Sequence, residues 1–217
     1  MVRVGEARSH ERFRWLADGA VTLCSGLNFL GHLYLSGTDP LITVGNFMAD
    51  AVKGRDLSRF DPKLEQGIRL HRAIDSYTDR HVLQRQGRER VHPHAGRYAS
   101  VVMDMFYDHL LAKHWNEYRE EPLPHFAQRM YGLLSAHAHL MPERTRNVLP
   151  YMVNRDWLTS YATLAGIGRA LEGLSHRVPM GAPMRGAERV LETNMEQYLS
   201  EFRSFLPEIE AHVAPMQ

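Results

Sequence analysis

Residues 104–115, DMFYDHLLAKHW, are the starting point for predicting the fold, because their pattern predicts a helix over residues 98–118. On a helix, Asp104 and Asp108 lie four residues apart and project from one face. His109 follows Asp108, so two carboxylates and an imidazole fall within two turns, and divalent metals accept both kinds of ligand. Taken alone, however, the segment favours an ordinary amphipathic helix whose acids are solvated and whose histidines pack or cap.

The rest of the chain shows the same helical periodicity and no convincing strand alternation. Its 217 residues and 44% hydrophobic content fit one domain with a substantial core. We therefore predict an all-α protein, a single-domain helical bundle of roughly seven helices. The other expected helices cover residues 41–52, 63–80, 81–97, 126–139, 156–172 and 187–211, with a short helix or loop at 142–155.

The charge and cysteine content exclude several functional classes. The 26 Lys and Arg residues nearly balance the 25 Asp and Glu residues, so the overall charge indicates neither a nucleic-acid nor a membrane partner. No apolar run approaches the roughly 20 residues of a spanning helix, and the first residues do not resemble a secretory signal. The single Cys24 excludes an internal disulfide and fits a reducing cytosol, so we expect a cytoplasmic protein. No pattern indicates an oligomeric state.

A second group of candidate ligands comes from other segments. His71 and Asp75 lie at i and i+4 of one expected helix, where they can share a metal or form a local hydrogen bond. Asp50 stands among apolar neighbours, and burying an acid is costly unless it is paired or bound to a cation. Asn46 lies one turn before Asp50 on the same face. His32 is surrounded by leucines and, on its own, is more typical of a satisfied core residue.

Basic side chains flank these candidates. Lys53 and Arg55 stand at an expected helix end, where cations suit the helix dipole. Arg72 adjoins His71 and can face a phosphate, although ordinary surface charge explains it equally well. Residues 85–97 contain four arginines. A solvated helix is the favoured interpretation of that segment, which is also the best local basic patch for an acidic partner.

The N-terminal residues differ from the rest of the chain because they are poorly patterned. We interpret residues 1–26 as an N-terminal extension outside the core. Residues 27–217 then form the helical domain that carries every candidate ligand named above.

Four segments carry a resemblance to a known family. They are NFLGHLYLS at 28–36, GNFMADAVKGR at 45–55, GIRLHRAIDSYTD at 67–79 and DMFYDHLLAKHW at 104–115. In this order they resemble the acyl carrier protein phosphodiesterases, the holo-carrier-protein hydrolases. The chain departs from the family pattern at Leu27, where the family usually begins with Met, and in the residues before it.

The resemblance implies an activity and a fold. The fold would be similar to the HD-type metal phosphohydrolases, without their standard motif string. The reaction would hydrolyse the phosphodiester that joins 4'-phosphopantetheine to a serine of acyl carrier protein, an acidic protein substrate of fatty acid biosynthesis. A divalent cation would activate the water, with Mn²⁺ expected and Mg²⁺ as the alternative.

The resemblance also assigns roles to residues of this chain. Asp50, His71 and Asp108 would be catalytic, and Asp50 would be a metal ligand or the general base. Lys53, Arg55 and Arg72 would hold the phosphate or the carrier protein. Asp75 and Asp104 would be ligands or would orient ligands. The implied metal set is His32, Asp50, His71, Asp75, Asp104, Asp108 and His109.

Two other functions are consistent with the same residues. One is an HD-like phosphohydrolase that acts on nucleotides, including those of the guanosine tetraphosphate type, through the same metal site. The other is a non-catalytic helical binding module whose acids and histidines are structural. This second alternative predicts no bound metal and no effect of a chelator.

Overall fold

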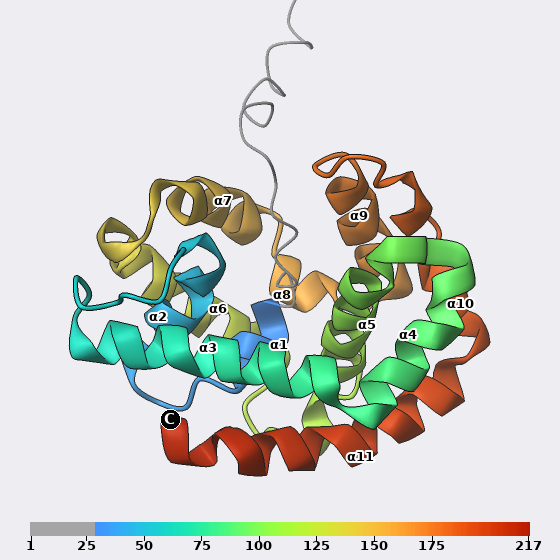
Figure 1. Cartoon of the computed structure of the whole chain (residues 1–217), viewed down its shortest axis with the longest axis horizontal. Coiled ribbons are helices and arrows are strands. Elements are labelled where there is room, and N and C mark those ends of the chain that lie inside the picture. Colours follow the sequence, from blue (N-terminus) through green and yellow to red (C-terminus); the bar gives the residue numbers. More distant parts are fainter. Residues whose placement is uncertain (1–28) are drawn as a thin grey trace, which may run out of the picture.

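The computed structural model describes residues 29–217, and no strand occurs in that range (Figure 1). The prediction of an all-α single domain is therefore confirmed. The expected extension, residues 1–26, lies outside the described residues. The α-helices are α1 (Phe29–Tyr34), α2 (Pro40–Met48), α3 (Pro62–Arg80), α4 (Val82–Ala95), α5 (Ala99–Lys113), α6 (Leu123–Ala136), α7 (Glu143–Asn154), α8 (Trp157–Ser160), α9 (Leu164–Ser175), α10 (Glu188–Thr193) and α11 (Met195–Val213).

The described range holds eleven α-helices, more than the seven or so expected, because two expected long helices are interrupted and α1 and α7 are also helical. The segment 156–172 divides into α8 and α9, and the Thr163 side chain caps α9 by accepting a hydrogen bond from the Gly166 N–H. The segment 187–211 divides at Asn194, whose φ of −115° and ψ of 24° fall outside helical geometry. The HD-like arrangement stays a prediction.

Helix α5 contains most of the DMFYDHLLAKHW segment, and almost all of its residues are buried. Its Phe106 and Tyr107 rings pack edge-on against Tyr198 and Phe202 of α11, with ring centroids 5.4 and 5.2 Å apart. Figure 1 shows α3 crossing the molecule between α1 and α11. A helix buried on nearly every face does not have the solvated acidic face that an ordinary surface helix would have.

The starts of α2 and α3 follow directly from the sequence. Asp39 precedes Pro40, and its carboxylate accepts hydrogen bonds from the N–H groups of Leu41 and Ile42. Asp61 precedes Pro62 in the same way and accepts from the Lys63 N–H at 2.8 Å. An acidic N-cap followed by Pro at the first helical position stabilises a helix start, so both boundaries are set locally.

Helices α2 and α3 cross with their backbones in contact. A Cβ placed on Gly45 would lie 2.2 Å from the Leu64 carbonyl oxygen, and one on Gly67 would lie 2.1 Å from that of Ile42. Only glycine fits at such a crossing, because any side chain would drive the helices apart. The crossing brings the end of α2 beside the middle of α3, where the candidate ligands lie.

None of the described helices combines the length and the apolar character that crossing a membrane requires.

Candidate metal centre

Three neighbouring helices bring the candidate ligands together. His32 comes from α1, Asn46 from α2, and His71 with Asp75 from α3. The two imidazoles stack, with ring centroids 4.0 Å apart and planes 23° from parallel. Within residues 29–217, the group of potential ligands whose donor atoms all fall within 4.8 Å of one another is His32, His71 and Asp75.

The Asn46 amide determines how the two imidazoles are oriented. Its Nδ2 donates to the His32 carbonyl oxygen at 2.9 Å and to Ser36 Oγ at 3.0 Å, so its Oδ1 must face the histidines. That oxygen accepts from His32 Nδ1 at 2.9 Å and from His71 Nδ1 at 3.2 Å. Both rings therefore carry their proton on Nδ1 in the neutral form, which leaves both Nε2 lone pairs free to bind a cation.

The Asp75 carboxylate faces both Nε2 atoms. One oxygen, Oδ1, lies 3.2 Å from His32 Nε2, and the other, Oδ2, lies 3.2 Å from His71 Nε2. His32 Nε2 is buried and has no partner in hydrogen-bonding geometry among the described residues. A carboxylate between two imidazole nitrogens that point toward it is an arrangement typical of ligands to one cation.

Asp50 reaches the same place from the 3₁₀ turn Ala49–Ala51 that follows α2. Its Oδ1 lies 3.2 Å from His71 Nε2. Its side chain is 29% exposed, whereas that of His32 is 4% exposed. Asp50 therefore contacts the centre from its more exposed side.

The electrostatics of this centre favour a positive charge. Burial alone would lower the pKa of His71, but the hydrogen bonds and charges of Asp50 and Asp75 raise that pKa to about 9. Burial would raise the pKa of Asp75, yet the contacts with His32 and His71 hold it well below its usual range. The two acids thus stabilise a cationic partner between them.

The donor set fits a divalent cation. Two ligand atoms bound about 2.1 Å from an octahedral cation and at right angles lie about 3.0 Å apart. The nitrogen–oxygen distances of 3.2 Å between Asp75 and the two histidines are close to that spacing. Imidazole and carboxylate donors without thiolates are common ligands of divalent metal ions.

Asp108, predicted to be catalytic and a ligand, makes a different set of contacts. Its Oδ1 accepts from the Gly31 N–H at 2.8 Å and its Oδ2 from the Leu30 N–H at 3.1 Å. Burial raises the pKa of Asp108 to about 7, although these two hydrogen bonds oppose the shift. In the described contacts this carboxylate holds the start of α1, the helix that carries His32.

Asp104 and His109 also contact other groups than the two histidines. Asp104 accepts from Gln84 Nε2 at 3.1 Å, and burial together with the nearby Asp75 charge raises its pKa well above the usual range. His109 Nδ1 donates to the Tyr161 carbonyl oxygen at 2.7 Å, and burial lowers its pKa to about 4. Their predicted roles as ligands stay predictions, and none of their hydrogen bonds involves His32, His71 or Asp75.

The residues predicted to hold substrate lie close in sequence to Asp50. Lys53 and Arg55 are exposed in the loop that follows the 3₁₀ turn. Arg72 instead braces this loop, because its Nη2 donates to the Val52 and Gly54 carbonyl oxygens at 3.3 and 2.8 Å. Lys53 and Arg55 are therefore the more available cations of the three.

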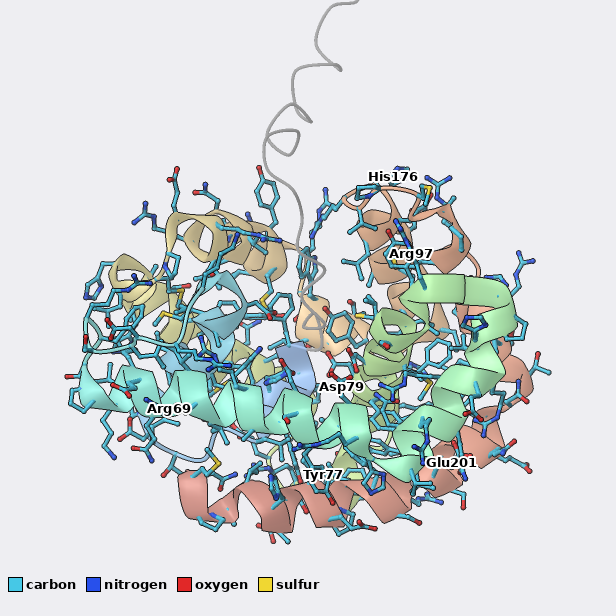
Figure 2. All side chains as sticks on the ribbon, viewed as in Figure 1. Arg69, Tyr77, Asp79, Arg97, His176 and Glu201 are labelled. Carbon is cyan, nitrogen blue, oxygen red and sulfur yellow. The ribbon has the colours of Figure 1, made fainter. Side chains whose placement is uncertain are left out.

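The arginines of residues 85–97 are mostly occupied by contacts within the molecule. Arg88 pairs with Asp79, Arg90 pairs with Glu201, and Arg97 donates to the Pro179 carbonyl oxygen. Figure 2 shows Glu201 on α11 near α4 and Arg97 below the segment that carries His176. The first two contacts join α4 to α3 and α11, and the third joins the 3₁₀ turn Gly96–Tyr98 to the loop after α9. Arg85 is the one of the four without a described partner.

Sequence reasoning did not assign a role to Asn46, although it placed this residue on the face of Asp50. The signal was available in the spacing, because GNFMAD puts an amide and a carboxylate four residues apart. What could not be read from the spacing is that two histidines from other helices converge on one amide oxygen.

Comparison with known proteins extends the resemblance over most of the described region. The family model described as acyl carrier protein phosphodiesterase matches residues 27–209. The chain is 32% identical over 184 residues to the acyl carrier protein phosphodiesterase of Serratia proteamaculans (strain 568), covering 84% of this chain and 95% of the relative. Identity to the proteins of the same name from Pectobacterium atrosepticum and Yersinia pestis is 32% and 30% over 182 residues, in each case 83% of this chain and 94% of the relative. No solved structure matches the chain.

The matched region contains all four segments that carried the resemblance, and it contains every residue of the candidate metal centre. The relatives are aligned over nearly their full length, so the likeness extends well beyond a shared motif. The resemblance inferred from the four segments is confirmed, and the chain belongs to the acyl carrier protein phosphodiesterase family.

Proposed function

We propose that this protein hydrolyses the phosphodiester between 4'-phosphopantetheine and the serine of holo acyl carrier protein, releasing apo carrier protein and 4'-phosphopantetheine. The observation that carries the proposal is the convergence of two imidazole nitrogens and the Asp75 carboxylate within 4.8 Å, in a chain of this family. The activity named for the relatives supports the same reaction.

The residues of the centre divide into holding and reacting roles. His32, His71 and Asp75 would hold a divalent cation, and Asn46 would keep both imidazoles in the tautomer that binds it. A cation held there would neutralise the phosphodiester and lower the pKa of a bound water. Asp50 is the more exposed acid and would accept the proton of the attacking water.

Residues outside the centre would orient the substrate. Lys53 and Arg55 are exposed and close to Asp50 in the chain, so they would contact the phosphate or the carrier protein. Asp108 would act through α1, because its carboxylate holds the start of the helix that carries His32. Asp104 and His109 would have supporting roles in the core.

The test uses Asp50→Asn with holo acyl carrier protein and Mn²⁺, and follows the mass of the carrier. Loss of a general base removes a contribution of about 10²- to 10⁴-fold, so the variant should retain at most about 1% of the activity. Asp56→Asn is the matched control, because Asp56 is an exposed acid of the neighbouring loop that accepts hydrogen bonds only from Ser58 among the described residues. EDTA should abolish the activity of the wild-type protein.

Full activity of folded Asp50→Asn would remove Asp50 from the mechanism. Unchanged activity in EDTA would exclude a dissociable metal. A nucleotide substrate such as guanosine tetraphosphate, tested in parallel, separates the HD-like alternative: turnover of that nucleotide without release from the carrier would overturn the proposed substrate.

A further inference from the structure

A cavity of about 130 Å³ lies between α5, α8, α9 and the start of α1. We call it the arginine pocket, lined by Arg155, Arg169, Arg177, Trp157, Tyr161 and Phe29. None of the candidate metal ligands lines it. Phe29 connects the two regions, because it lies one turn before His32 on α1 and its ring packs against Trp157, with centroids 6.2 Å apart.

Among residues 29–217, no acidic side chain pairs with the guanidinium groups of this pocket. None of Arg155, Arg169 and Arg177 forms an ion pair or a side-chain hydrogen bond with another residue of the described range. Arg177 is half-buried and lies over the Trp157 ring, 5.5 Å from its centroid. Arg155 and Arg169 are exposed, so an anion from solvent can reach them.

The charges around Arg177 are mutually unfavourable. Burial lowers the pKa of Arg177; Tyr161 opposes this shift, and the positive charges of Arg155 and Arg144 add to it. Positive groups that are partly removed from water and lack counter-ions gain most from binding an anion. The planar, forked donors of arginine suit phosphate and carboxylate oxygens in particular.

Apart from Ser160, the remaining walls of the pocket are apolar and aromatic. Phe29, Trp157 and Tyr161 are joined there by Met105 and Leu174. A small ion alone would leave this surface in water, whereas an anion attached to an apolar group would cover it. We infer that the arginine pocket binds a small organic anion, a phosphate monoester or a carboxylate joined to an apolar group, at a site separate from the metal centre.

The chain offers a matched pair of glycines for testing this. Gly173 lines the pocket within α9, and a Cβ placed on it meets no atom within 4 Å. A leucine there would extend into open space at the pocket wall without a clash in the fold. Gly132 lies inside α6, also meets nothing within 4 Å, and does not line the pocket. Both substitutions raise helix propensity equally, so they differ only in their relation to the pocket.

The experiment is calorimetric titration of the full-length chain with the anion probe. EDTA is present so that no metal ion is available to bind the probe at the metal centre. The probes are phenyl phosphate, benzoate and inorganic phosphate. Wild-type protein should bind phenyl phosphate or benzoate at one site and more tightly than inorganic phosphate. The difference in affinity between phenyl phosphate and benzoate shows whether the pocket prefers a phosphate or a carboxylate.

The variants decide whether that site is the arginine pocket. Gly173→Leu and Arg177→Met should each weaken binding by about tenfold or more, the effect of losing a charge-assisted hydrogen bond or the space itself. Gly132→Leu should bind as wild type. No saturable binding to wild-type protein, or equal affinity in Gly173→Leu and Gly132→Leu, would overturn the inference.

Discussion

Asn46 is a residue on which the geometry of the metal centre depends, because one amide oxygen orients two imidazoles. Asn46→Ala should lower the affinity for Mn²⁺ by about 10- to 100-fold, as is usual when a group that orients metal-binding histidines is removed. Calorimetry of the metal-free protein would measure this change directly.

The control for Asn46 is Asn154→Ala, because Asn154 is exposed at the end of α7 and its side chain makes no described hydrogen bond. The control should bind Mn²⁺ as wild type. Equal affinity in Asn46→Ala and wild type would show that packing alone orients the two rings.

Asp104 is a buried acid whose surroundings favour its neutral form. Gln84 Nε2 donates a hydrogen bond to Asp104 Oδ1, whereas Gln84 Oε1 is buried and has no described partner. A proton donor at position 104 would supply the hydrogen bond that Gln84 Oε1 lacks. Asp104→Asn supplies such a donor at every pH. We expect it to raise the free energy of unfolding at pH 7 in EDTA by about 1 kcal/mol, the usual contribution of one buried hydrogen bond.

The pH dependence follows from the raised pKa of Asp104, which is caused first by burial and then by the charges of Asp75, Asp79 and Asp108. The folded state binds this proton more tightly than the unfolded state. Its stabilising contribution is therefore complete below the unfolded pKa and is lost as pH rises through the folded pKa. Denaturant unfolding of wild type and Asp104→Asn should diverge as pH rises.

Asp79→Asn serves as the comparison for Asp104, because Asp79 is an exposed acid paired with Arg88. Its effect should stay within about 1 kcal/mol, as for other surface ion pairs. If Asp104→Asn instead destabilises the metal-free protein, burial does not dominate at this carboxyl group. If it lowers Mn²⁺ affinity as well, the ligand role predicted from the sequence gains support.

At the scale of elements, the crossing of α2 and α3 sets the distance between Asn46 and His71. Gly67→Ala would place a Cβ 2.1 Å from the Ile42 carbonyl oxygen and 2.8 Å from the Asn46 backbone nitrogen, so the helices must separate. We expect a loss of about 1–3 kcal/mol in the free energy of unfolding, typical of overpacking, together with weaker Mn²⁺ binding. Urea unfolding and metal titration measure the two effects.

Gly132→Ala is the control for the crossing, because its Cβ would meet nothing within 4 Å on the exposed side of α6. It should stabilise the protein by up to about 1 kcal/mol through helix propensity alone. Wild-type stability in Gly67→Ala would mean that the two helices can slide apart freely, and the close crossing would not position the centre.

At the scale of the whole molecule, a cation at the centre would join three helices that are otherwise held by packing. A ligand that binds only the folded state stabilises it by about 2.7 kcal/mol at 100 times its Kd. Mn²⁺ should therefore raise the Tm of wild-type protein, and EDTA should reverse the rise. Replacing His71 by Ala should remove the effect, since that side chain contacts Asn46, Asp50 and Asp75.

Differential scanning calorimetry measures the Tm shift, with Ca²⁺ as a second ion that prefers more and longer oxygen contacts. A Tm rise that persists in the His71 variant would place the stabilising metal elsewhere in the chain.

The local features of this protein were determined by the sequence itself. Helical periodicity predicted an all-α fold, because the 3.6-residue repeat is set within each segment. The His71–Asp75 pair could be read from spacing, since residues four apart share a face of one helix. The four motif segments were enough to place the chain in its family.

Which candidates meet was decided only by the tertiary structure. From the sequence, His32 resembled a core histidine, yet its Nε2 on α1 faces the Asp75 carboxylate on α3. Asp108 looked like a ligand on its own helix, yet its carboxylate holds the start of α1. Spacing shows which side chains share a face, but the rotation and crossing of each helix, set by contacts such as those of Gly45 and Gly67, decide what that face meets.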